Sequence, residues 1–230
     1  MKIRSSNELI DFLAGRRKER KRELISLSQD IADARKSAPH YKRAAVVLSY
    51  AHWEGFVKDA ASAYVFFVSH KSKKLSDLIV NFQALACRQE LMCAQIATRR
   101  LSPHINVARR FTEDLDRTFN INADNVIDTE SNLSSIVFEN ICACVGINYH
   151  RAWATDGPFM DDLLKNRCAV AHGELYTPTN DYALETLSFT IKSIDRFSTD
   201  IENEAINEAY LRSSATQLRA LEGGANGAVS

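Results

Sequence analysis

The segment AAVVLSYAHWEGFVK, residues 44–58, is the most apolar helical pattern in the chain. The apolar pattern continues through residues 64–68, YVFFV, and Pro39 suits the first position of a helix. The sequence therefore predicts a helix from Pro39 to about His70. Because apolar side chains occupy most of its circumference, we expect this helix to lie at the centre of the fold.

The composition favours helices throughout the chain. Its 230 residues include only 8 Gly and 4 Pro, so turn signals are few. Hydrophobic residues make up 45% of the sequence and charged residues 25%, which is usual for a globular protein. The sequence predicts an all-α fold. Further helices are expected at residues 7–36, 76–97, 104–119, 132–145, 158–173 and 180–212.

Several residues set the expected limits of these helices. Ser131 is expected to cap the helix that begins at residue 132, and Gly146 is expected to end it. Gly173 is expected to end the next long helix. Thr179 or Asn180 is expected to cap the last one.

The chain shows no internal repeat and no clear domain boundary, so we expect a single domain over residues 1–212. Residues 75–120 are expected to form a peripheral helical section of this domain. Residues 213–230 end in GGANGAVS and are expected to form a flexible tail. Loops are expected at residues 120–130 and 147–157.

Positive and negative charges balance, with 29 basic and 29 acidic residues. Affinity for a nucleic acid would therefore have to come from a local patch. The densest basic run is RRKERKRE, residues 16–23. This run is either a solvated helix face held by i,i+4 ion pairs or a patch that follows the phosphates of RNA. In the second interpretation the RNA-binding residues are Arg16, Arg17, Lys18, Arg20 and Lys21.

The cysteines and the hydropathy pattern predict a cytoplasmic protein without a membrane segment. We expect all five cysteines to be reduced. The first residues show no signal peptide, and the most apolar run, residues 44–69, is interrupted by charges. Cys142 and Cys144 would point about 200° apart on a helix, so no zinc site is expected. No Gly-rich phosphate loop or HExxH motif is present, and no cofactor is expected.

The segment NRCAVAHGE, residues 166–174, contains the residues best suited to catalysis. Arg167 is always charged and can stabilise a phosphoryl group through two hydrogen bonds. His172 can gain or lose a proton near neutral pH. Such a pair suits RNA cleavage, in which the 2′-OH loses its proton, phosphorus gains negative charge and the leaving oxygen is protonated. The plainer interpretation is that Arg167 pairs with an acidic neighbour and His172 caps a helix.

The spacing of this pair restricts how its members can cooperate. Five residues along an α-helix place Arg167 and His172 about 140° apart around the axis. They can cooperate if the helix ends near Gly173, or if two copies meet about a two-fold axis so that both pairs line one cleft. Asn166 or Glu174 is a candidate for orienting the imidazole.

Glu54, on the central apolar helix, is a further candidate. It stands four residues before Lys58, so one interpretation is an ion pair on the helix surface. The other interpretation places its carboxylate near Arg167 and His172.

Two of these segments together resemble the HEPN superfamily. NRCAVAHGE resembles its R-x4-6-H signature, and LSYAHWEGFVK, residues 48–58, resembles the motif around E-G-F-x-K in its MAE-like and RiboL-PSP-type members. The resemblance runs from about residue 5 to residue 210, although only these two segments are specific. It implies a bundle of long antiparallel helices, a homodimer formed through the motif helices, and metal-independent cleavage of RNA. Proteins of this kind are often toxins or anti-phage effectors, which implies an antitoxin or a defence-system protein as a further partner.

The resemblance also assigns roles to individual residues. Arg167 and His172 match the catalytic pair, and Glu54 matches an acidic position often placed near the cleft. Cys168 departs from the family, which usually has Asn, Asp or His after the arginine. Some members bind nucleotides or proteins without cutting RNA, so the alternative function is a non-catalytic binding or assembly module.

Overall fold

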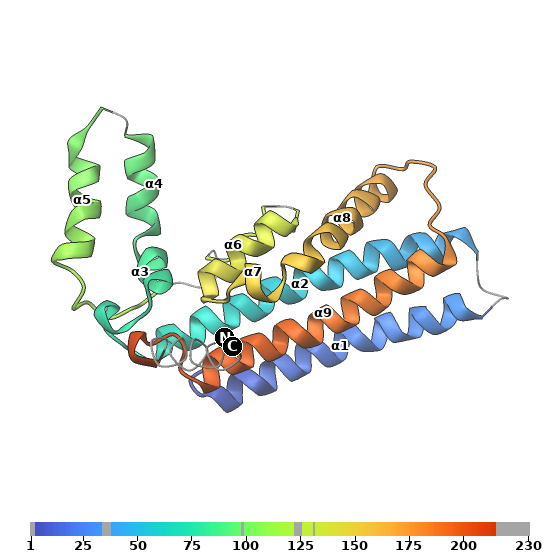
Figure 1. The fold of residues 1–230 in the computed structure, drawn as a ribbon, viewed down its shortest axis with the longest axis horizontal. Coiled ribbons are helices and arrows are strands. Elements are labelled where there is room, and N and C mark those ends of the chain that lie inside the picture. Colours follow the sequence, from blue (N-terminus) through green and yellow to red (C-terminus); the bar gives the residue numbers. More distant parts are fainter. Residues whose placement is uncertain (1–2, 34–37, 98, 122–125, 131, 215–230) are drawn as a thin grey trace, which may run out of the picture.

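The computed structural model describes residues 3–33, 38–97, 99–121, 126–130 and 132–214. Three long helices form its body: α1 (Ser6–Ala32), α2 (Pro39–His70) and α9 (Asn180–Ile206). Each packs against the other two, and α1 runs opposite to α2 and α9 (Figure 1). No β-strand occurs in the described residues, so the predicted all-α bundle is confirmed.

The helix predicted to be central is central. α2 contacts α1, α9, α6 and α8, and it buries residues along its whole length. α6 (Ser135–Val145) and α8 (Gly157–Ala171) cover the side of α2 that faces away from α1 (Figure 1). The short α7 (Tyr149–Ala152) and a 3-10 turn (Ala154–Asp156) connect them.

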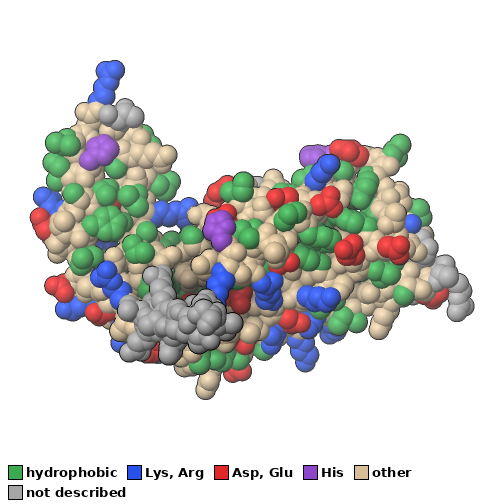
Figure 2. Space-filling view, viewed as in Figure 1, with side chains coloured by type: hydrophobic (Ala, Val, Ile, Leu, Met, Phe, Trp, Pro, Cys, Tyr) green, Lys and Arg blue, Asp and Glu red, His purple; other side chains and the backbone are tan. Residues whose placement is uncertain are grey.

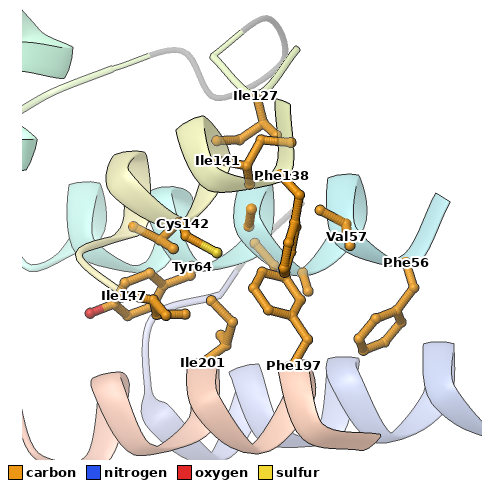
Figure 3. Packing of buried hydrophobic residues seen from close by; sticks show 14 of the residues in the cluster. Phe56, Val57, Tyr64, Ile127, Phe138, Ile141, Cys142, Ile147, Phe197 and Ile201 are labelled. Carbon is orange, nitrogen blue, oxygen red and sulfur yellow. The ribbon is translucent and has the colours of Figure 1, made fainter. Parts of the chain in front are cut away.

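Aromatic side chains fill the space where α2, α6 and α9 meet. Trp53 lies with its ring centroid 5.1 Å from that of Phe138, and Phe138 lies 5.3 Å from Phe197. Figure 3 shows Phe138 reaching down from α6 toward Phe197 on α9. Trp153 closes the cluster, and its indole N–H donates to Asp200 at 2.9 Å. Such edge-to-face packing stabilises one arrangement of the helices that carry the site.

A helical hairpin projects from one end of the body (Figure 1). A 3-10 turn (Leu75–Asp77) and α3 (Val80–Ala86) lead into α4 (Arg88–Ile96) and α5 (Leu101–Thr112). We call residues 88–112 the arm. Its base is held by backbone hydrogen bonds from Leu75 to Arg117 and from Phe119 to Lys73. α5 buries none of its residues, and α4 buries only Ala94.

Several predicted helix limits were wrong. The helix expected over residues 76–97 is divided at Cys87, where the backbone leaves helical geometry between α3 and α4. The helix expected at residue 104 begins earlier, because Pro103 lies in the first turn, where its missing N–H is tolerated. Part of the loop expected over residues 147–157 is helical, as α7 and the following 3-10 turn. The last helix ends at Ile206, before the expected residue 212.

The predicted helix caps were partly right. Ser134, not Ser131, caps α6, since its hydroxyl accepts the N–H of Val137 at 3.2 Å. Ser131 itself lies outside the described residues. Gly146 ends α6 with a φ of 85°, and Thr179 caps α9, as expected.

Two further predictions concern the C-terminal tail and the absence of a membrane segment. Apart from Ser213 and Ser214, the expected flexible tail over residues 213–230 lies outside the described residues. Within the described helices, none is both long enough and apolar enough to cross a membrane.

Candidate functional site

The end of α8 places His172 at the surface. α8 ends at Ala171, and Gly173 adopts a φ of 80°, which a residue with a side chain rarely takes. The N–H groups of Gly173 and Glu174 return to the carbonyls of Val170 and Ala169, at 3.2 and 3.0 Å, as in a Schellman motif. His172 is exposed, and its imidazole has no hydrogen bond or ion pair to the described residues.

Arg167, by contrast, is half-buried against α2. Its guanidinium carbon lies 4.6 Å from the centre of the Tyr50 ring, in a cation–π contact. One terminal nitrogen of Arg167 also donates to the side-chain oxygen of Asn132 at 3.1 Å. The same nitrogen lies 3.7 Å from the Cys168 sulfur. The guanidinium is therefore fixed in place before any ligand arrives.

Tyr50 provides a rigid platform for Arg167. Its ring is buried, and its hydroxyl oxygen accepts the backbone N–H of Leu133 at 2.5 Å. Burial raises the pKa of Tyr50 to about 12, with a smaller contribution in the same direction from the Glu54 carboxylate. The phenol is therefore neutral at physiological pH, and the charge of Arg167 is not neutralised by its platform.

The pair is separated within one chain. Five residues correspond to about 7.5 Å along the helix axis, and no hydrogen bond joins Arg167 to His172 in the described structure. One condition for their cooperation is met, because α8 ends at the residue before His172. The two-fold arrangement requires a second copy and stays a prediction.

The supporting residues on α8 are placed differently from one another. Asn166 donates to Asp162 at 3.0 Å and to the Tyr182 hydroxyl at 2.7 Å, so it ties α8 to α9 instead of facing His172. Cys168 is half-buried beside Arg167. Glu174 is exposed next to Gly173, and its carboxylate has no partner in the described residues.

Glu54 lies one turn after Tyr50 on α2 and is half-buried. The described residues show no ion pair between Glu54 and Lys58. The Glu54 carboxylate raises the pKa of Tyr50, and the charge of Arg167 lowers it. Both charges therefore lie near Tyr50. The described residues show no hydrogen bond or ion pair between Glu54 and Arg167.

The basic run on α1 is largely engaged with acidic side chains. Arg20 pairs with Asp59 of α2 at 2.8 Å, and Lys21 pairs with Asp195 of α9 at 2.5 Å. Further ion pairs join Arg16 to Glu19 and Asp59, and Arg17 to Asp195 and Glu202. Lys18 is exposed and has no ion pair among the described residues. These contacts fit the interpretation as a helix face held by ion pairs, while RNA binding by the run stays a prediction.

Sequence reasoning missed three residues that contact the site: Tyr50, Arg43 and Asn132. Arg43 of α2 donates to the carbonyl of Val170 at 3.5 Å, which places a second cation near the end of α8. Asn132 holds the guanidinium of Arg167. Arg43 stands seven residues before Tyr50 and eleven before Glu54, so all three share one face of α2. The spacing of seven and eleven residues could have indicated that Arg43 lies near Tyr50 and Glu54. No sequence pattern indicated Asn132.

No group of three or more His, Cys, Asp or Glu side chains in the described residues is arranged to hold a metal ion. All five cysteines lie in described positions, and none forms a disulfide. A cavity of about 390 Å³ lies between α3, α4 and α6. None of the predicted site residues lines it, so this cavity is separate from Arg167 and His172.

The fold and the pair define a class of protein: an all-α bundle that carries an R-x4-H motif at the end of a helix packed on α2, as in the HEPN superfamily. A comparison with protein families shows which family within the superfamily the chain matches. The family model described as RiboL-PSP-HEPN matches residues 16–207, which is most of the chain. The chain therefore belongs to the RiboL-PSP-HEPN family. No curated protein and no solved structure was found to match it.

Proposed function

We propose that the protein is a metal-independent endoribonuclease of the HEPN type, which cuts RNA at a cleft shared by two copies of the chain. The proposal rests on a difference between two side chains: that of Arg167 is fixed by its contacts, and that of His172 is not. Arg167 is held on the face of Tyr50, while His172 is exposed at the end of the same helix. A fixed cation beside a free imidazole suits phosphate binding followed by proton transfer.

Arg167 has the donors that such a reaction needs. Its hydrogen bonds to described residues come from only one terminal nitrogen, which leaves the rest of the guanidinium fork for a phosphoryl group. Because Tyr50 and Asn132 already fix its position, little reorganisation accompanies substrate binding. Arg43 adds a second positive charge at the same end of α8.

The reaction needs both a base and an acid. A neutral His172 takes the proton from the 2′-OH while the 2′-oxygen forms its bond to phosphorus. The bond from phosphorus to the 5′-oxygen then breaks, and that oxygen takes a proton from an imidazolium. The products are a 2′,3′-cyclic phosphate and a free 5′-OH. The motif supplies one histidine per chain, and a two-fold dimer supplies the second.

The proposed biological role comes from the family resemblance. A ribonuclease of this kind acts in the cytoplasm as a toxin or an anti-phage effector, and an antitoxin or defence-system protein restrains it. Because Cys168 stands where the family usually has a polar residue, the alternative is a non-catalytic module that binds RNA, a nucleotide or a protein partner. The two functions differ in whether the pure protein cuts RNA.

The test is cleavage of end-labelled RNA in EDTA by wild-type protein, Arg167→Ala and His172→Ala. Lys165→Ala, an exposed position on the same helix, is the matched control. We expect each variant of the pair to lose at least about 100-fold in rate and the control to keep the wild-type rate. The products should end in 2′,3′-cyclic phosphate. Wild-type rates in both variants of the pair, or no cleavage by a wild-type dimer, would contradict the proposal.

A further inference from the structure

The arm exposes more apolar surface than a hairpin of its size can keep in water alone. On α5, Leu101 is 71% exposed and Ile105 45%. On α4, Met92 is 54% exposed and Ile96 81%. Helices of 9 and 12 residues are marginal in isolation, and this hairpin buries almost nothing of its own. A row of exposed apolar side chains on such an element marks a surface that another molecule covers.

The exposed face of α5 has the spacing of a docking helix. Leu101, Ile105 and Ala108 follow one another at i, i+4 and i+7 and are all exposed. Val107 and Phe111 of the same helix are half-buried, and Arg110 joins α5 to α4 by pairing with Glu90 at 2.6 Å. Anchors at this spacing are typical of a helix that lies in an apolar groove.

The same chain contains such a groove. The cavity of about 390 Å³ is lined by apolar residues of α3, α4 and α6, with Leu91 on its α4 side. Ile136 stands one turn before Asn140, which lines the cavity, and is 75% exposed on the same face of α6. Figure 2 shows the surface hollowed between the arm and the body, with hydrophobic side chains gathered over the arm.

The charges of the arm and of the groove are opposite. Arg99 and Arg100, both exposed, stand at the start of α5 at the tip of the arm. Asp128 and Glu130, also exposed, line the groove together with one exposed cation, Arg88, so acidic charge is in excess there. A basic tip and an acidic rim attract each other and set the direction in which a helix would lie in the groove.

We propose that the groove between α4 and α6 receives the exposed face of α5 from a second copy of this chain, and that the two copies exchange arms in this way. The arm projects on the side of α2 that carries α6 and α8, so a copy paired there lies within its reach (Figure 1). The inference rests on the homodimer of the proposed function but not on its chemistry.

Twelve residues of α5 span about 18 Å along the helix axis. A two-fold dimer contains the contact between α5 and the groove twice, so both exchanged arms add to one interface.

The first test is the association of an arm variant, Leu101→Glu with Ile105→Glu, measured by sedimentation equilibrium. Both positions are exposed, so the variant keeps the helical circular dichroism of the wild type. Ile206→Glu, at a position of α9 that is 57% exposed, is the control. We expect a wild-type dimer, a control that matches it, and a dissociation constant at least about 30-fold higher in the arm variant. A monomeric wild type, or an arm variant that associates as tightly as the wild type, would overturn the inference.

The second test is chemical cross-linking between chains. All proteins carry Cys93→Ser and Cys144→Ser, because Cys93 is exposed and Cys144 lines the groove. Protein with Ile105→Cys is mixed with protein with Ile136→Cys, and we expect a disulfide between the two chains under mild oxidation. Ile206→Cys in place of Ile136→Cys is the control and should give none. A yield no higher than that of the control would count against the exchange.

The two proposals can fail separately. A dimer that depends on the arm but does not cut RNA would remove the proposed function alone. A protein that cuts RNA and keeps its dimer with both arm anchors replaced would remove the arm exchange alone.

Discussion

The body of the protein and its arm contain similar apolar residues in opposite surroundings. In the body, Trp53, Phe138 and Phe197 are fully enclosed and contact one another. In the arm, Leu101 and Ile105 stand in solvent. The comparison teaches that the helical pattern alone does not separate a residue of the core from a residue of an interface. The body is stabilised by its own packing, while the arm has no core and is completed, on our proposal, by a second copy.

The largest effect expected from this contrast is on stability. Phe138→Ala removes a ring from the aromatic cluster and should lower the free energy of unfolding by about 3–5 kcal/mol. Leu101→Ala in the arm should change it by less than about 0.5 kcal/mol in the dilute monomer. Urea unfolding followed by the fluorescence of the two tryptophans measures both. Similar losses in the two variants would mean that the arm has internal packing after all.

The next effect separates the two members of the pair. Arg167 belongs to the body, so Arg167→Ala should lower the free energy of unfolding by about 1–2 kcal/mol through loss of the Tyr50 and Asn132 contacts. His172 is exposed, so His172→Ala should leave stability unchanged. Both should lose cleavage. An equal loss of stability in both variants would show that His172 is held by contacts, contrary to this account.

Two glycines give a smaller and more precise test. Gly173 has a φ of 80°, so Gly173→Ala should cost about 1 kcal/mol and should disturb the position of His172. Gly15 lies inside α1, with no atom within 4 Å of an added Cβ. Gly15→Ala should therefore stabilise the protein by about 0.5–1 kcal/mol. Thermal unfolding shows whether each variant is more or less stable than the wild type. A Gly173→Ala variant that is more stable than the wild type would contradict the left-handed conformation of Gly173 at the end of α8.

The smallest effect is a pH dependence. Burial lowers the pKa of His52 below its ordinary value of 6.5, against the opposing charge of Glu23, 2.9 Å away. Because the unfolded chain binds the proton more readily, this contribution to stability is complete above pH 6.5 and is lost as the pH falls below it. His52→Gln should therefore lose less stability than the wild type between about pH 7.5 and about pH 5.5. The same substitution at His104, exposed on the arm, is the control. A variant with the wild-type pH dependence would contradict the assignment.

The fold was predictable where local signals agreed. The apolar pattern of α2 predicted the central helix. Gly146 and Gly173 predicted the ends of α6 and α8, and Thr179 predicted the start of α9. The prediction failed where one residue type has two roles: the helix expected at residue 104 begins at Leu101, because Pro103 fits its first turn. Ser134 caps α6 with the same chemistry that was assigned to Ser131.

The candidate site was predictable in its residues but not in its contacts. The motif indicated Arg167 and His172, and helix geometry showed that one chain keeps them apart. The platform formed by Tyr50 depends on how α8 packs on α2, which no local pattern encodes. Asn166 was one of two candidates, with Glu174, for orienting the imidazole; in the structure it donates to Asp162 on its own helix and to Tyr182 of α9.

The central claim is that two copies share one catalytic cleft. Its most direct test is RNA cleavage by a heterodimer of one wild-type chain and one His172→Ala chain, purified through two different tags and assayed in EDTA. The shared cleft of this heterodimer holds one imidazole in place of the two that the reaction needs, so its rate should fall at least about 100-fold below that of the wild type. A heterodimer that keeps about half the wild-type rate would contradict the shared cleft, because each chain would then cut RNA alone.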